Sequence, residues 1–352
     1  MKKLHLSFLK YKRTALRLCS VPKARPLSRV VYFLFFIFYF LFFLGCSTDF
    51  SVTAPWKEIT VVYGLLNPSD SVQYIKINKA FLGEGNVLHM AGVADSSNYR
   101  NILDVKLQQL SDGSLIQLSR DSSIPKNPGT FASVPNILYK TNTPISQGND
   151  YKLIIHNTQS GKIITATTKM VNNSILNNPK DDLSQLSFTG GMYPYKVNWT
   201  TGINGKIYNL VIRFHFVEVN KTTHDSSYKS LDWTFPNVKA ATLQGGEELF
   251  IEFNQIDFYK FIAAHLAVND EVKRIANNLD FIFTVGADAL NTYVEVNEPS
   301  TGLVQEKPQY TNIDGGIGIF SSRLTQSILE KKLTKQTVDS LSGGYYTKLL
   351  GF

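Results

Sequence analysis

Histidines have the broadest chemical range in this sequence, because an imidazole can bind a metal or act as a general acid or base near neutral pH. Five of them follow residue 45: His89, His156, His215, His224 and His265. None has a second histidine, a cysteine or a carboxylate at the spacing of a metal site, and no His-Glu-x-x-His segment occurs. The sequence therefore predicts no metal site, and a structural or surface role for each histidine.

Two pairs of adjacent acidic residues are the next candidates for acid–base chemistry, Asp181-Asp182 and Glu247-Glu248. Side chains of adjacent residues diverge, whereas glycosidases need two carboxyl groups about 5–9.5 Å apart across a cleft. We expect both pairs to be solvated turn charges. No Gly-x-Ser-x-Gly, P-loop or EF-hand segment is present. The sequence thus predicts no catalytic residues and no cofactor.

The cysteines indicate a different chemistry, the attachment of a lipid. Only Cys19 and Cys46 occur, so a chain that begins at Cys46 has no partner for a disulfide. Cys46 ends the tetrad Phe43-Leu44-Gly45-Cys46, which resembles a lipobox with Phe43 where leucine is usual. In a lipobox, small residues precede a cysteine whose thiol takes up diacylglycerol. We expect residues 1–45 to be a lipoprotein signal peptide and Cys46 to carry the lipid.

The composition of residues 1–45 supports export. Nine basic residues and no acidic ones accompany an apolar run over 30–44, whose 15 residues would reach about 22 Å as a helix. This is short of the ~30 Å hydrocarbon core of a bilayer, although an uncleaved N-terminal membrane anchor remains the alternative. Two or more acyl chains would hold the processed chain stably on a membrane.

The same leader accounts for the basic charge of the chain. The whole sequence has 36 basic and 28 acidic residues and a net charge of +8. Without residues 1–45, it has 27 basic against 28 acidic residues. A nearly neutral body gives no electrostatic reason to expect a nucleic-acid partner.

Beyond Cys46 the pattern predicts a tether and then a first domain. Residues 46–55 are expected to be a short polar tether, and 47–50 resembles the signal for surface export of Bacteroidota lipoproteins, with one acidic residue where two or more are usual. A linker without a signal is the alternative. Residues 56–171 carry about seven short alternating strands, separated by turns such as Asp112-Gly113 and Ser160-Gly161. This spacing predicts a Greek-key β-sandwich of the immunoglobulin or transthyretin-like type.

A polar, asparagine-rich stretch over 172–182 predicts a boundary. Residues 183–352 are then expected to form a β-rich domain with helices near 255–279 and 327–341. A new N-cap at Asn269 predicts that the first of these is either two helices or one kinked helix. A strand is expected over 292–296. In the strand expected over 206–219, five apolar side chains should share one face: Tyr208, Leu210, Ile212, Phe214 and Phe216. The predicted fold class is mainly β.

These segments resemble an uncharacterised β-rich outer-membrane lipoprotein family of the Bacteroidota, a domain-of-unknown-function family often encoded beside TonB-dependent receptors. The likeness covers most of residues 56–325, and its most distinctive part is Tyr310–Phe320 (YTNIDGGIGIF). The tail from Leu324 to Phe352 lies outside it. The resemblance implies an outer-membrane, surface-facing location beside a transport or secretion machine, and it supplies no catalytic residues.

Within Tyr310–Phe320 the glycines indicate unusual backbone geometry. Gly315, Gly316 and Gly318 suggest positive φ angles or a close approach of two backbones, and Asn312 suits a turn. The favoured interpretation is a tight structural turn that leads the following strand into the core. A loop that contacts a ligand or partner is the alternative.

Aromatic side chains could form a platform for sugars, although core packing is the commoner role. The candidates are Trp56, Trp199, Trp233, Tyr345 and Tyr346. We therefore expect a non-enzymatic, lipid-anchored outer-membrane protein, an accessory or binding subunit of a transport or secretion complex of the TonB-dependent-receptor type. Its expected partners are the outer membrane and an outer-membrane transporter or secretion protein. The alternatives are a surface hydrolase of glycans or peptides, and an adhesion lipoprotein.

Overall fold

The computed structural model describes residues 31, 33, 34, 36, 58–80, 86–190, 193–299 and 309–352. The chain divides into two units, Met1–Ala54 and Pro55–Phe352. In the first unit, the four described residues have helical backbone. Among the described residues, strands hold 45% and helices 15%, so the fold is mainly β, as predicted.

The first half of the larger unit consists of short antiparallel strands. They are β1 (Thr60–Leu66), β2 (Gln73–Lys79), β3 (Leu103–Gln109), β4 (Leu115–Asp121), β5 (Leu138–Thr141), β6 (Tyr151–Asn157) and β7 (Ile163–Thr168). Two short helices, α2 (Val87–Ala91) and α3 (Ala94–Ser97), lie between β2 and β3. The hairpins predicted at Asp112-Gly113 and Ser160-Gly161 are confirmed, since β3 pairs with β4 and β6 with β7. Gly113 and Gly161 supply the positive φ angles of these turns, +77° and +70°.

The second half has longer strands and three helices. The strands are β8 (Ile175–Asn178), β9 (Tyr195–Thr200), β10 (Ile207–Asn220), β11 (Ser226–Lys239), β12 (Glu248–Phe253), β13 (Val272–Gly286), β14 (Ile313–Asp314) and β15 (Gly316–Lys332). The helices are α4 (Gln255–His265), α5 (Asp288–Asn297) and α6 (Lys335–Gly343). A three-stranded sheet has the order β12-β9-β8, and the other strands form one sheet in the order β11-β10-β13-β15-β1-β2-β5-β4-β3-β6-β7-β14.

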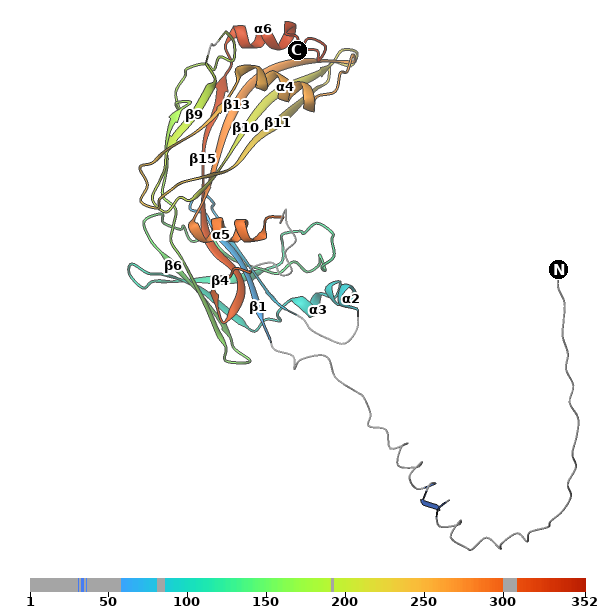
Figure 1. Cartoon of the computed structure of the whole chain (residues 1–352), viewed down its shortest axis with the longest axis vertical. Helices are drawn as coiled ribbons and strands as arrows, with labels where there is room; N and C mark the ends of the chain where they lie inside the picture. Colours follow the sequence, from blue (N-terminus) through green and yellow to red (C-terminus); the bar gives the residue numbers. More distant parts are fainter. Residues whose placement is uncertain are drawn as a thin grey trace, which may run out of the picture. The chain divides into compact units, whose positions relative to one another are not determined.

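Burial along β10 follows the predicted alternation. The five apolar side chains from Tyr208 to Phe216 are buried, and the residues between them are partly exposed. They belong to a core that also takes Trp199 from β9, Phe258 from α4 and Phe283 from β13. In Figure 1, α4 covers one face of the long strands β10, β11 and β13. Period-two patterning therefore identified the buried face of this sheet correctly.

Two helix predictions were wrong in extent. The helix predicted over 255–279 ends at His265, and residues from Val272 onward form β13. Asn269 does accept a hydrogen bond, from Glu271 N at 2.9 Å, but this closes a turn instead of capping a helix. Pairing along the whole of β10 and much of β15 supplies β13 with hydrogen bonds on both edges, which outweighs local helix preference.

The C-terminal helix and one strand also differ from prediction. The helix expected over 327–341 is α6, which begins after Thr334, because β15 continues to Lys332 on β13. The Thr334 side chain accepts a hydrogen bond from Thr337 N and caps this helix. The strand expected over 292–296 lies inside α5. The apolar residues of this segment fit both the two-residue repeat of a strand and the 3.6-residue repeat of a helix. Contacts with β10 and β15 favour the helix.

Strand β15 belongs to both cores. Its first seven residues pair in parallel with β1, and residues from Arg323 onward pair with β13. Phe320 lies in the core of the first half, whereas Leu324 and Ile328 lie in that of the second. Figure 1 shows β15 running from the side of β1 towards α6. The division into domains 56–171 and 183–352 remains a prediction, and one continuous strand joins the two parts.

Side chains on β15 also hold the segment that links the two halves. Ser322 Oγ donates to Lys169 O at 2.6 Å and accepts from Val171 N at 3.2 Å. Gln326 bonds both backbone groups of Ser174, at 2.7 Å to the N and 3.0 Å to the O. The start of the predicted boundary stretch is therefore fixed to the sheet.

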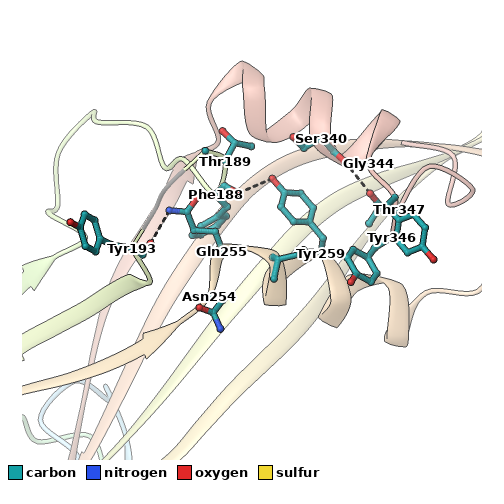
Figure 2. Close-up of a pocket in the computed structure, with 13 residues that line it drawn as sticks. Phe188, Thr189, Tyr193, Asn254, Gln255, Tyr259, Ser340, Gly344, Tyr346 and Thr347 are labelled. Atoms are coloured by element: carbon teal, nitrogen blue, oxygen red, sulfur yellow. Dashed lines mark hydrogen bonds between the residues drawn. The ribbon is translucent and has the colours of Figure 1, made fainter.

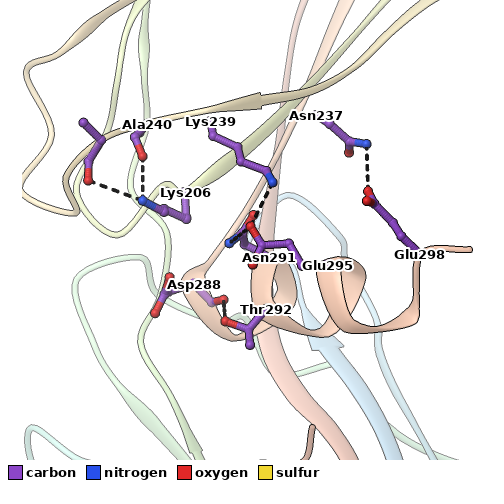
Figure 3. A network of polar contacts seen from close by, with 10 residues as sticks. Lys206, Asn237, Lys239, Ala240, Asp288, Asn291, Thr292, Glu295 and Glu298 are labelled. Atoms are coloured by element: carbon purple, nitrogen blue, oxygen red, sulfur yellow. Dashed lines mark hydrogen bonds and ion pairs between the residues drawn. The ribbon is translucent and has the colours of Figure 1, made fainter. Parts of the chain in front are cut away.

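A polar network fastens α5 to the end of β11 (Figure 3). Lys239 Nζ lies 2.8 Å from Glu295 Oε1, and Asn291 Nδ2 donates to the same oxygen at 3.2 Å. Asn237 donates to Glu298 Oε1 at 3.3 Å. The Lys239 ammonium is the main reason why the pKa of Glu295 lies below its usual range. Lys239 and Asn237 at the end of β11 thus each hold one carboxylate of the segment formed by α5 and the residue after it, so the network serves as a clamp.

Candidate functional site

The residues of the predicted lipidation signal, Phe43, Leu44, Gly45 and Cys46, lie outside the described residues, as does Trp56. Within the larger unit, no helix among the described residues has the length and apolar character needed to cross a membrane.

The glycine motif lies at the turn between β14 and β15. Gly315 has a φ of +76° and Gly318 a φ of +114°. A Cβ atom on Gly318 would lie 2.0 Å from Val62 O, and one on Gly316 would lie 2.7 Å from Thr60 O. These glycines therefore let β15 approach β1 closely. Asn312, just before β14, bonds the backbone of Phe320 with its side-chain amide.

One histidine has a carboxylate partner that local spacing did not reveal. His215 Nε2 lies 2.8 Å from Asp280 Oδ2, and Arg213 forms a two-point ion pair with Asp232 at 2.6 and 2.8 Å. These side chains lie on the face of the sheet away from the core, and the partner of His215 is 65 residues away in sequence. Across the described parts of the chain, no three His, Cys, Asp or Glu side chains gather closely enough to hold a metal ion.

In the two adjacent acidic pairs, Asp182, Glu247 and Glu248 each contact a different partner. Asp182 bonds the buried ammonium of Lys331 at 2.9 Å, so it is an ion-pair residue as well as a turn residue. Glu247 accepts from Ala241 N at 2.7 Å, whereas Glu248 accepts from Asn198 at 2.9 Å. Neither pair forms a two-carboxylate site.

A cavity of about 450 Å³ lies where α4, α6 and the segment after Leu186 meet, and we call it the α4–α6 pocket. Its described lining residues are Phe188, Thr189, Gly190, Tyr193, Asn254, Gln255, Ile256, Tyr259, Ser340, Gly344, Tyr345, Tyr346 and Thr347. Its volume falls within the roughly 300–1,000 Å³ range of small-molecule sites. Figure 2 shows Tyr193 and Tyr346 at its two ends, with Gln255 and Tyr259 between them.

The floor of the pocket is held by buried hydrogen bonds. Phe188 N donates to Thr337 Oγ1 of α6 at 2.9 Å, and Tyr259 Oη donates to Phe188 O at 3.2 Å. The Phe188 ring contacts Phe258 of α4, with 4.7 Å between ring centroids. Burial is the main cause that raises the pKa of Tyr259, so its phenol stays protonated at neutral pH.

One wall is the turn that follows α6. Gly344 N and the Thr347 hydroxyl both donate to Ser340 O, the hydroxyl at 3.2 Å. A Cβ atom on Gly344 would lie 2.3 Å from Ser340 O, so this position requires glycine. Thr347 is buried, whereas Tyr345 and Tyr346 project with 83% and 38% of their surface exposed. The buried turn thus fixes two exposed aromatic rings at the rim.

None of the described residues that line the α4–α6 pocket carries a charged side chain. A second cavity, of about 430 Å³, combines Glu58 and Asp95 with Lys79 and Arg100. A third, of about 450 Å³, combines Lys76, Lys79 and Lys126 with apolar side chains. The α4–α6 pocket alone among these three combines several tyrosines with neutral hydroxyl and amide groups. It is the site best suited to a neutral polar ligand.

The aromatic candidates from the sequence divide between core and rim. Trp199 is fully buried against Tyr208 and Phe283. The Trp233 ring stacks on Phe261, with 5.3 Å between centroids and 15° between planes. Of these candidates, only the Tyr345-Tyr346 pair lines the pocket. Tyr193, Asn254 and Gln255 come to it from distant segments, and no local signal in the sequence indicated them.

No family model matches the chain, and no curated protein matches it.

Proposed function

We propose that this chain is a non-enzymatic, lipid-anchored protein of the outer membrane that binds a ligand in the α4–α6 pocket. It acts as an accessory or binding subunit of a transport or secretion complex of the TonB-dependent-receptor type. The observation that carries the proposal is the position of the pocket relative to the point where the chain enters the fold.

That position follows from β15. The chain enters the larger unit at β1, whose first residue, Thr60, pairs with Gly316 at the start of β15. The α4–α6 pocket lies beyond the other end of β15, where α6 begins three residues after Lys332. A 17-residue strand with a rise of ~3.3 Å per residue spans about 50 Å. Within the larger unit, the start of β1 and the α4–α6 pocket therefore lie towards opposite ends of β15.

A binding role accords with the chemistry of the pocket. Its polar groups are hydroxyls, amides and a protonated phenol, none of which is a general base at neutral pH. A surface hydrolase would need convergent acids or an activated nucleophile in the same place.

We further propose that residues 56–171 form the predicted Greek-key sandwich. Strand order supports this, since β6 lies beside β3 and the sheet continues through β4 to β5. Three consecutive hairpin-connected strands with the fourth beside the first make a Greek key.

Lipid attachment is tested by labelling cells that express the full chain with an alkyne analogue of palmitate. The chain and its Cys19→Ser variant should incorporate the label, and the Cys46→Ser variant should not. Equal labelling of the Cys46→Ser variant would overturn the anchor at this residue.

Partnership is tested by affinity purification of the full chain from solubilised outer membrane. The proposal predicts an outer-membrane transporter or secretion protein in near-stoichiometric amount. Recovery of the chain alone after mild crosslinking would contradict the accessory role.

A further inference from the structure

We propose that the ligand of the α4–α6 pocket is a neutral carbohydrate, held by hydroxyl and amide groups on the pocket walls and by the tyrosine rings at its rim. This inference rests on the proposed binding function and specifies its ligand. It concerns the chemical class of the ligand, a short neutral oligosaccharide, and not one particular sugar.

The polar groups of the pocket match those of a sugar. A sugar hydroxyl both donates and accepts hydrogen bonds, and so does each hydroxyl or amide side chain of the pocket. Thr189, Asn254 and Ser340 present such groups from three different segments. No described lining residue carries a charge that would demand a phosphate, a carboxylate or an amine in return.

Asn254 has a side-chain amide that the fold leaves available at the pocket. It is the N-cap residue of α4, where an asparagine side chain usually accepts a hydrogen bond from the first turn. Here the Asn254 side chain makes no capping hydrogen bond, and it is exposed at the pocket. Its amide is therefore available to a ligand, and its replacement should leave the stability of the helix almost unchanged.

The tyrosines at the rim of the pocket are largely exposed. Tyr193 and Tyr345 are 76% and 83% exposed, and both border the same opening. Exposed aromatic residues are common singly, but a group around one cavity indicates a binding surface. A pyranose ring has C–H groups on its faces and hydroxyls at its edge, so it suits aromatic faces beside polar walls.

The arrangement of the rings argues against a flat aromatic ligand. Tyr345 and Tyr346 are nearly perpendicular, with 88° between planes and 5.1 Å between centroids. They cannot sandwich a nucleobase between parallel faces. A peptide would need a strand edge, a hydrophobic groove or charged groups for its termini, and the described lining has no strand and no charge.

The test uses the full chain, purified in detergent, on an array of neutral and acidic glycans. The strongest neutral oligosaccharide is then titrated by calorimetry against the parent chain and three variants. Tyr345→Ala should weaken binding roughly 3- to 10-fold, the loss of one aromatic contact, and Asn254→Ala should also weaken it. Tyr228→Ala removes an equally exposed tyrosine (84%) from β11, outside the pocket, and should bind like the parent.

Thermal unfolding of all four proteins should agree within a few degrees, so a loss of affinity is not a loss of fold. Binding to no neutral glycan on the array, preference for acidic glycans, or equal affinity of Tyr345→Ala and the parent would each overturn the inference. Copurification with an outer-membrane transporter is measured separately. Its persistence in a chain that binds no sugar would refute the ligand class and leave the accessory role standing.

Discussion

Asn312 and Phe320 are joined by two hydrogen bonds between the side-chain amide of the first and the backbone of the second. Asn312 Oδ1 accepts from Phe320 N at 2.9 Å, and Asn312 Nδ2 donates to Phe320 O at 2.6 Å. Phe320 also lies opposite Gly64 in the parallel ladder with β1. On the other edge of β15, Ala287 N donates to Ser322 O, and β13 begins to pair at Arg323. The Asn312 side chain thus supplies the hydrogen bonds at this edge of β15, just before the residues that pair with β13.

Replacing Asn312 by alanine should therefore destabilise the fold. The backbone N–H and C=O of the buried Phe320 would both lose their partner, at a cost of about 1–3 kcal/mol. Urea unfolding followed by circular dichroism measures the change. Asn297→Ala is the control, because that exposed side chain makes one bond to Tyr293 O and its loss should cost less than ~0.5 kcal/mol. Equal midpoints for the two variants would refute the role given to Asn312.

Gly318→Ala should be more damaging. The new Cβ would meet Val62 O at 2.0 Å at a φ of +114°, so β1 and β15 would have to separate. We expect a loss of about 3 kcal/mol or more, or insoluble protein. Gly148→Ala is the matched control, because no atom lies within 4 Å of its added Cβ. Unfolding midpoints of the two variants give the comparison, and a stable Gly318→Ala protein would contradict the close approach.

The Asp182–Lys331 pair predicts a pH dependence. Hydrogen bonds from Ser184, then the Lys331 ammonium, lower the pKa of Asp182 to about 2, from an ordinary value of 3.8. A lowered folded-state pKa adds stability above pH 3.8, and this is lost as the pH falls towards 2. Asp182→Asn should thus unfold at lower urea than the parent at pH 7, and the difference should shrink below pH 4.

Two variants sharpen that experiment. Asp181→Asn alters the adjacent exposed carboxylate and should leave the midpoint almost unchanged. Lys331→Met removes the buried ammonium itself, so it should cost less than Asp182→Asn, which leaves that charge with neutral partners only, Asp182 O and Ser184 Oγ. A difference between parent and Asp182→Asn that is the same at pH 7 and below pH 4 would contradict the contribution of the ionised carboxylate.

Arg274→Met should loosen the C-terminal residues. The buried guanidinium pairs with Glu218 at 2.9 Å and donates to Leu350 O at 2.6 Å and Ala267 O at 3.1 Å. Losing these bonds should cost about 2–3 kcal/mol. Hydrogen exchange should show faster exchange near Leu350, and the exposed neighbour Lys273→Met should match the parent. Unchanged exchange in Arg274→Met would argue against this fastening.

The sequence identified features that depend on local pattern. Alternation revealed the buried face of β10, and Asp112-Gly113 revealed a hairpin, because both signals lie within a few residues. It failed where distant pairing decides. Residues 272–279 have a local pattern that resembles a helix, but hydrogen bonding to β10 makes them a strand. Residues 327–332 also resemble a helix locally, but hydrogen bonding to β13 makes them a strand.

The pocket was only partly visible in the sequence for the same reason. Tyr345-Tyr346 stands out as an aromatic pair. Asn254 and Gln255 reach the pocket because β12 ends there, and Tyr193 reaches it just before β9 begins. Nothing in the residues around 193 or 254 indicates that they share a cavity. The contact between His215 and Asp280 was also invisible in the sequence, because the pairing of β10 with β13 brings these two residues together.

The proposed outer-membrane protein is expected to face the cell surface, as the family resemblance implies, and the most direct test is whether the pocket end is displayed on living cells. The chain has only Cys19 and Cys46. If it is cleaved before Cys46 and lipidated there, as we propose, Ser342→Cys on the exposed side of α6 supplies its single free thiol. Cells that express this variant are treated with a membrane-impermeant maleimide. The account predicts labelling of the mature protein on intact cells, lost when the cells are treated with protease beforehand. Labelling only after the cells are lysed would contradict it.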